Sequence, residues 1–550
     1  MRRAVFTMAL LLLCMSLAAS FTASPDDKKG RAKTSRKAAA PKKDTKRVYL
    51  IHADELSYDK PYTYIEAPQI LNGHVEFEHA GARLKCDSAC FFEASNSFEA
   101  FGNVKMTQGD TLSLTSDYGF YDGNNQLLEA KDNVVLKHRK TTLYTDSLYF
   151  DRIYSMGYFE EGGQLVDGNT TLISDWGEYH TDTKTAIFYY DVRMHDKNFL
   201  LTTDSLYYDT NLKMAHIVGP SDITSGKSHI YSELGYYDTQ REQSRLMRRS
   251  RIDNGQRTIT ADSIFHDEPK AISEAYGDVV YEDKTNRNKM LSDYGYYDDS
   301  TGYALITDSA LVIDYSQPDT LYMHADTFKV FTFNHKTDSV NRILHAYNHV
   351  KAYRRDVQAV CDSLVYIEKD SCMTLYRDPI LWNLNQQLLG EVIHIYMNDS
   401  TVNRAHVVNQ AFSIEKLKED KAFNQVSSKE MFAFFDKGEI REAKAVTNVV
   451  VAYYPEDHAD SSYVGLITMN TSQLRMFLKD RQLERIWTPK SDGVMYPMTQ
   501  IPPQKRFLEG FAWFDDIRPT SPQDVFVWRG KRQDQVLKPQ ERREPPKVKL

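Results

Sequence analysis

A short pattern recurs along most of the chain, and it constrains the fold more than any other feature. It reads small residue, acidic residue, three variable residues, aromatic residue and Asp, as in Ser116-Asp117-Tyr118-Gly119-Phe120-Tyr121-Asp122. In the most regular copies the acidic residues follow one another at steps of 29, at Asp117, Asp146, Asp175, Asp204, Glu233 and Asp262. Equal steps indicate a repeat protein, in which each copy adds one structural unit and stacked neighbours share a core.

A second pattern lies roughly midway between the copies of the first. It consists of Gly, Asn or Asp before a β-branched residue, as in Gly102-Asn103-Val104 and Gly277-Asp278-Val279. This composition is typical of a turn that leads into a strand. Helical periodicity is absent from most of the chain, and the 12% of aromatic residues favours strands. We therefore predict an all-β stack of about a dozen rungs, with at least two short strands per copy.

Side chains alternate between the two faces of a strand, so the repeat also predicts an inward face. A large aliphatic residue stands two positions before the small residue of each copy, and a β-branched residue follows each turn. The first column contains Leu114, Leu143, Leu172, Leu201, Ile230, Ile259, Met290, Met323 and Leu388; the second, expected to oppose it, contains Val104, Val134, Val192, Ile223, Val279 and Val350. Together they line either a closed, dry core or a groove that holds an acyl chain.

The N-terminus differs from the repeat region in composition. Residues 1–23 have a basic start, an apolar run at 9–13 and small residues near the end, the pattern of a secretory signal peptide. Residues 24–47 form a basic linker without aromatic residues, which we expect to be disordered. The stretch 26–47 carries +7; with the +2 of Arg2 and Arg3, it leaves −17 on the rest of a chain whose net charge is −8. An exported acidic body argues against a nucleic-acid partner.

The rest of the chain divides by its pattern. The repeat array is expected over 48–480, either as one array or as two or more consecutive domains with a break near 300–320. An aromatic and Pro-rich region at 481–530 is expected to cap the array or to dock a partner, and 531–550 is a charged tail expected to be disordered.

No residue pattern points to catalysis, a metal or a cofactor. The motifs of serine hydrolases, zinc proteases and P-loop proteins are absent, as is CxxC. The recurrent Asp is interpreted as an Asx-turn residue, because the Gly-Gly-x-Gly-x-Asp calcium pattern is missing. A disulfide between Cys361 and Cys372 is a weak candidate, since export permits disulfides.

The alternation of the two patterns resembles the OstA-like family, which includes periplasmic lipopolysaccharide-transport proteins of the LptA type. Ala261–Asp267 with Gly277–Val280 show both motifs in one copy, and Gly102-Asn103-Val104 shows the second motif cleanly. The stretch 431–454 looks like a terminal OstA copy, and Gly510-Phe511-Ala512-Trp513 is similar to the tail of long members. The resemblance covers residues 48–530, with many more copies than the short members have.

This resemblance implies a stacked β-jellyroll, or taco-like solenoid, with a short C-terminal cap. Its apolar interior would shield the lipid A acyl chains of lipopolysaccharide in the periplasm, without enzymatic activity or a cofactor. Its partners would be an inner-membrane-anchored component and an outer-membrane barrel. Open sheet edges at the ends of the stack also permit head-to-tail self-association. The alternatives are a structural or adhesive secreted β-solenoid and, with less support, a β-helical polysaccharide-degrading enzyme.

Overall fold

The computed structural model describes residues 46–58, 67–197, 199–398, 401–418, 422–436, 439–457, 462–479 and 482–531. The predicted signal peptide, nearly all of the basic linker and nearly all of the charged tail lie outside these residues. The described residues form two compact units. The N-terminal unit contains residues up to Asn254 and Ser263–Pro269, and the C-terminal unit contains Gly255–Asp262 and the residues from Lys270 onward.

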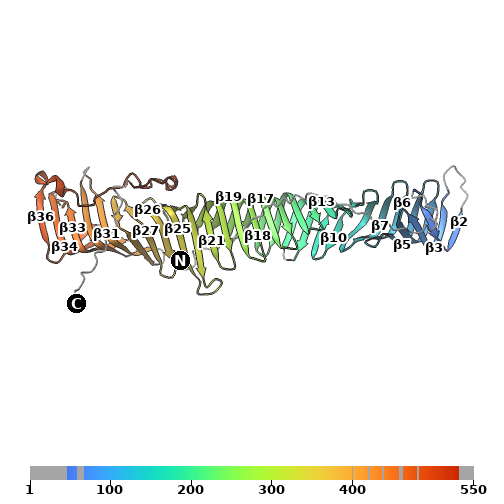
Figure 1. Ribbon diagram of the computed structural model, residues 1–550, viewed down its shortest axis with the longest axis horizontal. Coiled ribbons are helices and arrows are strands. Elements are labelled where there is room, and N and C mark those ends of the chain that lie inside the picture. The colour runs from blue at the N-terminus through green and yellow to red at the C-terminus, as the bar shows by residue number, and fades with distance from the viewer. Residues whose placement is uncertain are drawn as a thin grey trace, which may run out of the picture. The chain divides into compact units, whose positions relative to one another are not determined.

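The described secondary structure is almost all strand (Figure 1). The N-terminal unit holds β1(Tyr49–His52), β2(Glu55–Tyr58), β3(Gln69–His79), β4(Ala82–Phe92), β5(Ser97–Gln108), β6(Leu112–Asp122), β7(Leu127–His138), β8(Thr141–Asp151), β9(Met156–Phe159), β10(Gly163–Asp167), β11(Thr170–Ser174), β12(Trp176–His180), β13(Thr185–Asp196), β14(Phe199–Asp209), β15(Met214–Ser225), β16(Ser228–Asp238) and β17(Gln243–Asp253). Strand β18(Arg257–Asp267) contributes residues to both units.

The C-terminal unit holds β19(Ile272–Asp283), β20(Asn288–Asp298), β21(Tyr303–Thr307), β22(Leu311–Asp314), β23(Leu321–His324), β24(Thr327–Phe333), β25(Asn341–Tyr353), β26(Val357–Ile367), β27(Cys372–Tyr376), β28(Ile380–Asn383), β29(Gln386–Leu389), β30(Val392–Asn398), β31(Thr401–Lys416), β32(Phe423–Asp436), β33(Glu439–Tyr453), β34(Gly465–Lys479), β35(Gln482–Trp487) and β36(Asp492–Pro497). The helices are the 3-10 turns η1(Met498–Gln500), η2(Pro503–Lys505) and η3(Gln523–Phe526). None of the described helices has the length and apolar character needed to cross a membrane.

Each copy of the repeat forms two long antiparallel strands, which corrects the expectation of short strands separated by turns. In the pair β5–β6, Phe101 pairs with Tyr118 and Val104 pairs with Ser116, so Gly102 and Asn103 together oppose one residue. Both have positive φ, 73° and 45°. The Gly-Asn-Val motif is therefore a β-bulge in the middle of a strand, a site where strands bend.

The acidic residue of the repeat holds the bulge of the next strand. The side-chain amide of Asn133 donates to the carboxylate of Asp117 over 2.6 Å. The same contact joins Asn103 to Asp87, His74 to Asp54, His349 to Asp326, Arg377 to Asp362 and Asn409 to Glu391. Bulge residues in the left-handed region are strained unless they are Gly or Asn, so this contact stabilises an unfavourable backbone.

The small residue before the acidic residue also provides a hydrogen-bond donor for a backbone carbonyl beside the bulge. The Ser116 hydroxyl donates to the Tyr118 carbonyl over 2.8 Å. Equivalent bonds join Thr145 to Ser147, Ser174 to Trp176, Thr203 to Ser205 and Ser232 to Leu234. A buried carbonyl without a partner destabilises the fold, which explains why these positions are Ser or Thr.

The last Asp of each copy forms the Asx turn that the sequence predicts. Asp122 accepts from the backbone N–H groups of Asn124 and Asn125 at 2.8 and 3.2 Å. Asp151, Asp209, Asp238 and Asp298 do the same, as does Asp283 at the end of β19. The Asx interpretation is thus correct for the closing Asp and wrong for the mid-strand acidic residue.

The bulges place the two halves of each strand in two facing layers. Layer A contains residues such as 104–108 and 112–116, and layer B contains residues such as 97–101 and 118–122. Phe77 of layer A stacks on Phe98 of layer B at 4.1 Å between ring centroids, although no ladder pairs them. In the N-terminal unit this interior forms a continuous core from Val48 to Ile217. Each unit is thus a stacked β-jellyroll with the bulges along its closed side.

The segment after β36, residues 498–531, lies against one layer of the C-terminal unit, and we call it the strap. Figure 1 shows it in red, running back from β36 along the strands. Phe514 and Ile517, each 2% exposed, pack with Trp382, Phe412 and other residues of β26 to β32. These partners point outward from layer A, since Leu388 and Leu381 on the alternating positions pair on the inward face.

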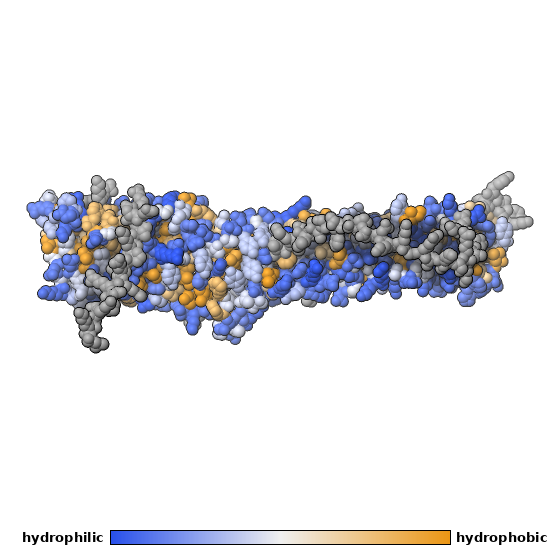
Figure 2. All heavy atoms as spheres, viewed as in Figure 1, coloured by the Kyte–Doolittle hydropathy of each residue, from blue (hydrophilic) through white to orange (hydrophobic). Residues whose placement is uncertain are grey.

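Buried amides fix the strap to the sheet. Gln387, 1% exposed, donates to the Ala512 carbonyl over 2.8 Å and accepts from the Phe514 N–H over 2.9 Å. Gln425 binds the backbone of Arg506 and Leu508 in the same way. Elsewhere the visible exterior of both units is largely hydrophilic (Figure 2). The C-terminal region therefore covers the outer face of a layer as well as extending the array through β35 and β36.

We expect Ser116→Val to lower the free energy of unfolding of the N-terminal unit by about 1–3 kcal/mol, because the Tyr118 carbonyl loses its donor. Urea unfolding followed by circular dichroism measures this change. Ser113→Val, on the outward face of the same strand, is the control and should change stability little. Equal effects of the two substitutions would contradict the proposed role of the hydroxyl.

Gln387→Leu should loosen the strap, because it leaves the strap backbone and the Trp382 indole N–H without their partner. The expected loss is about 1–3 kcal/mol, seen as faster hydrogen exchange at Phe514. The neighbouring exposed Gln386→Leu serves as the control. Unchanged exchange at Phe514 in the Gln387 variant would show that these bonds do not hold the strap.

Candidate functional site

The predicted inward residues all lie on layer A, and the two columns stand side by side. In β5–β6, Met106 pairs with Leu114 and Val104 pairs with Ser116. The expectation that the columns oppose each other is therefore wrong, because the bulge separates layer A from layer B. The opposing lining comes from layer B, from residues such as Leu148, Phe188 and Leu206. In the sequence, the fourth position of each copy alternates between Gly and Leu or Ile, and this alternation indicates the inward-facing residues of layer B.

The predicted residues differ in how deeply they are buried. Val104, Val134, Val192, Val279, Val350, Leu114, Leu143, Leu172, Leu201, Ile259, Met290 and Met323 are buried. Ile223, Ile230 and Leu388 are partly exposed. These exceptions mark two places where the interior meets solvent.

The first place is the inward face of the C-terminal unit. Ala352, Ala359, Leu381 and Leu388 follow one another across paired strands β25, β26, β28 and β29, and all are partly exposed. On the facing layer, Ile395 is also partly exposed, whereas residues nearer the bulges, such as Val350 and Ile393, are buried. The two layers thus leave apolar side chains accessible along the side away from the bulges.

That side is where strand ends and turns of the two layers meet, and we call it the mouth. In the N-terminal unit the mouth is closed by polar pairs. His79 Nδ1 lies 2.8 Å from the Tyr121 hydroxyl, and His138 Nδ1 lies 2.9 Å from the Tyr179 hydroxyl. One copy later, the Tyr208 hydroxyl donates to Asp167 over 3.0 Å.

The series continues with Asp196 and Tyr237, which interact electrostatically. The partners are 41 or 42 residues apart in every pair, and the pairs from His138 onward advance by 29 residues. We call this series the zip. Because each pair joins layer A to layer B, the zip holds the mouth closed over the apolar core.

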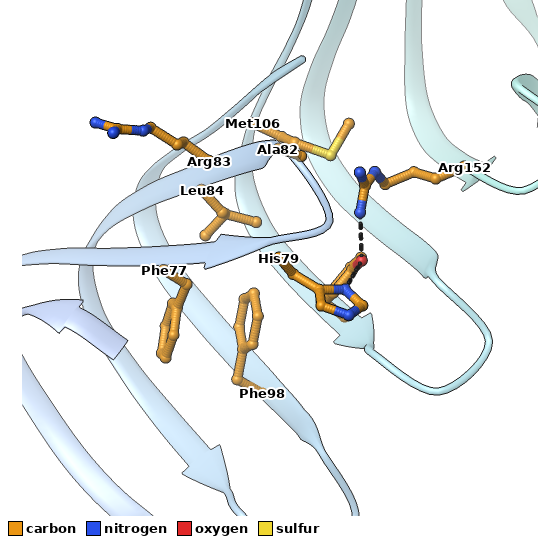
Figure 3. A pocket seen from close by; sticks show the side chains of 9 residues that line it. Phe77, His79, Ala82, Arg83, Leu84, Phe98, Met106 and Arg152 are labelled. Atoms are coloured by element: carbon orange, nitrogen blue, oxygen red, sulfur yellow. Dashed lines mark hydrogen bonds between the residues drawn. The ribbon is translucent and has the colours of Figure 1, made fainter. Parts of the chain in front are cut away.

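Where a copy has Phe in place of Tyr at the zip position, an arginine provides the polar contact across the mouth. Phe150 occupies the Tyr position of its copy, and the nearby Arg152 donates to Gln108 at 3.1 Å and to the Tyr121 hydroxyl at 2.7 Å. Figure 3 shows His79 and Arg152 converging above Phe77 and Phe98. The pocket there has about 240 Å³ of empty space and is bridged by these contacts.

Burial changes the acidity of the zip residues. It raises the pKa of the Asp196 carboxyl and lowers the pKa of the His138 imidazole, because both charged forms lose hydration. It also raises the pKa of the Tyr179, Tyr208 and Tyr237 hydroxyls, so these remain neutral donors. Lys213 adds an ion pair to Asp167 at 2.5 Å, and Lys197 pairs with Glu242.

The second place where the interior opens is a cavity in the N-terminal unit, with about 660 Å³ of empty space that includes open solvent. Its deep wall is apolar and contains Leu201, Ile217 and Ile230. Its rim is polar and contains Ser225, Glu242, His266 and Glu268. The cavity thus unites three of the predicted groove residues, Leu201, Ile223 and Ile230.

The cysteines and acidic residues form no further site in the described residues. Cys361 and Cys372 are free thiols; Cys361 pairs with Val350, while Cys372 pairs with Ile367, roughly 20 Å farther along β26. Burial raises the pKa of the Cys86 thiol to about 12. In the part of the chain that the structure describes, no group of His, Cys, Asp and Glu could hold a metal ion.

The zip should make stability depend on pH through His138. Unfolded His has a pKa of about 6.5, and burial lowers the pKa in the folded state, so the unfolded chain binds the proton first. The free energy of unfolding should fall below pH 6.5, by at most about 1.4 kcal/mol per pH unit from this group. His138→Gln should make the fall between pH 7 and pH 5 shallower, whereas the exposed His195→Gln should not. The same slope in both variants would contradict this assignment.

Parts of the chain are similar to known proteins. Residues 45–204 and 190–262 match the family described as OstA-like protein, and no curated protein matches the chain. Among solved structures, the chain is similar to LptH from Pseudomonas aeruginosa, an LptA-homologous periplasmic component of its lipopolysaccharide transport device. The likeness to LptH has 12% identity and a TM-score of 0.20, over 26% of this chain and 95% of LptH. Residues 45–262, the region of the bulged strands and the zip, are thus similar to the OstA-like protein family.

Proposed function

We propose that the protein is a non-enzymatic carrier of lipopolysaccharide that shields acyl chains between the two layers. The observation that carries the proposal is the row of partly exposed apolar side chains on the inward face of the C-terminal unit, from Ala352 to Leu388. The match of residues 45–262 to the OstA-like family supports the lipopolysaccharide class. Each buried CH₂ group contributes about 0.8 kcal/mol, so a few rungs suffice to hold one chain.

The proposal also includes the surroundings of the protein. It acts in the periplasm after export, between an inner-membrane-anchored component and an outer-membrane barrel. Its last strands, β35 and β36, expose Ile486, Trp487 and Val494 by 44%, 47% and 52%. Apolar residues beside open sheet edges favour head-to-tail association with a partner or a second copy.

A structural solenoid is the second candidate, and close packing in the N-terminal unit favours it there. A Cβ atom added at Gly177 would lie 2.6 Å from the ring of Phe159, its paired neighbour on β9, so this ring already fills the space above the glycine. A purely structural role would leave the protein without bound lipid. Catalysis on a polysaccharide has no such observation in its favour.

Photo-crosslinking tests the carrier proposal. A photoreactive residue at Leu388, on the inward face, should label purified lipopolysaccharide. The matched control is the adjacent Leu389, which is 2% exposed and packs beneath the strap, and it should give little label. Equal labelling from both positions, or none from Leu388, would contradict the proposed site.

A further inference from the structure

We propose that the cavity beside Ser225 and His266 is a lateral port, through which one acyl chain of an amphiphile enters the N-terminal unit while its headgroup stays outside. This inference rests on the proposed function and assigns it a point of entry. The zip closes the mouth and so separates the apolar core of this unit from solvent, which means that a lipid needs an opening to enter.

The zip changes composition at the port. Successive copies place Asp167 opposite Tyr208 and Asp196 opposite Tyr237. The next step of 29 residues gives Ser225 and His266. The serine side chain is shorter than that of Asp, and His lacks the reach of the Tyr hydroxyl. Both residues line the cavity, so the mouth is wider where the long pair is replaced.

Residue pairs of the preceding copy border the port on one side. Phe199 and Tyr237 meet across the mouth with ring centroids 4.6 Å apart, and Tyr237 also interacts electrostatically with Asp196. Lys197 and Glu242 form an ion pair beside them. Beyond this closed edge, Ile223 and Ile230 are partly exposed, whereas Leu201 is 1% exposed.

The cavity leads from solvent into the core. Met194, Leu201, Leu206 and Ile217 belong to the continuous core of the unit, and all except Leu206 line the cavity. A chain that enters past Ser225 therefore meets the apolar side chains of Met194, Leu201 and Ile217, which belong to the core. The polar residues of the lining other than tyrosine are Ser225, Glu242, Ser244, His266 and Glu268, and the other lining residues are aliphatic or aromatic.

This arrangement fits an acyl chain better than a peptide. Where the protein binds an extended peptide, as it does with the strap, buried amides such as Gln387 and Gln425 contact the peptide backbone. Among the described residues that line the cavity, none is an Asn or Gln that could bind a peptide backbone in this way. An acyl chain has no backbone groups to satisfy, so an apolar wall is sufficient.

The test restores the zip at the port. Ser225→Asp together with His266→Tyr, the closed-port variant, reproduces the pair found one and two copies earlier, so folding should be preserved; thermal unfolding checks this. A photoreactive residue at Leu201 then reports entry of purified lipopolysaccharide and, in a separate arm, of a single-chain lysophospholipid. We expect loading to slow by about tenfold in the closed-port variant, which corresponds to roughly 1.4 kcal/mol.

The control variant carries Thr224→Asp together with Phe265→Tyr, the same new side chains on neighbouring positions of the opposite face. Loss of loading in the closed-port variant alone supports the port. Loading at the wild-type rate in the closed-port variant overturns it, as does an equal loss in the control. Labelling by the lysophospholipid alone assigns the port to single-chain amphiphiles and excludes lipopolysaccharide as its ligand.

Failure of the port and failure of the carrier give different results. If the closed-port variant loads normally while Leu388 still labels lipopolysaccharide, the carrier stands and the port is wrong. If neither Leu388 nor Leu201 labels any lipid in the unmodified protein, both proposals are wrong. Asp196→Ser together with Tyr237→His, which extends the opening by one copy, should accelerate loading in the same assay.

Discussion

The bulge in the middle of each strand is the constraint on which the rest of the structure depends. Two residues in the left-handed region bend the strand, and the carboxylate of the preceding copy stabilises that backbone. A Ser or Thr hydroxyl satisfies the carbonyl beside the bend. Because the bend recurs in every copy, the strand halves assemble into two facing layers, and the apolar side chains between them become an interior.

The sequence predicts the part of this structure that is periodic. The 29-residue step and the aliphatic residues before each copy give the all-β stack and the inward face of layer A, from Leu114 to Leu388. Bulges were mistaken for turns, because Gly and Asn favour both, and only the pairing of Phe101 and Val104 with the next strand distinguishes them. The opposing layer was missed for the same reason.

Other features depend on contacts between residues of different copies, which the pattern within one strand does not reveal. The zip joins residues 41 or 42 apart, such as His138 and Tyr179, and becomes visible only when two copies are compared. The replacement of an Asp–Tyr pair by Ser225 and His266 can be recognised only after the spacing of the zip pairs is known. In the described residues of the N-terminal unit, the zip closes the mouth from His79 to Tyr237 and a cavity opens beside Ser225 and His266, whereas the C-terminal unit leaves its inward face accessible.

The strap affects the order in which the parts of the C-terminal unit can fold. Lys351, Gln358 and Gln387 bind strap groups that lie 125 to 176 residues later in the chain. Until the last described residues are available, Trp382 and Phe412 would form an uncovered apolar face. During synthesis or export from the N-terminus, the C-terminal unit would thus remain vulnerable to aggregation while the earlier rungs are already complete. Removal of the strap would therefore uncover side chains in the middle of the sheet, such as Trp382 and Phe412.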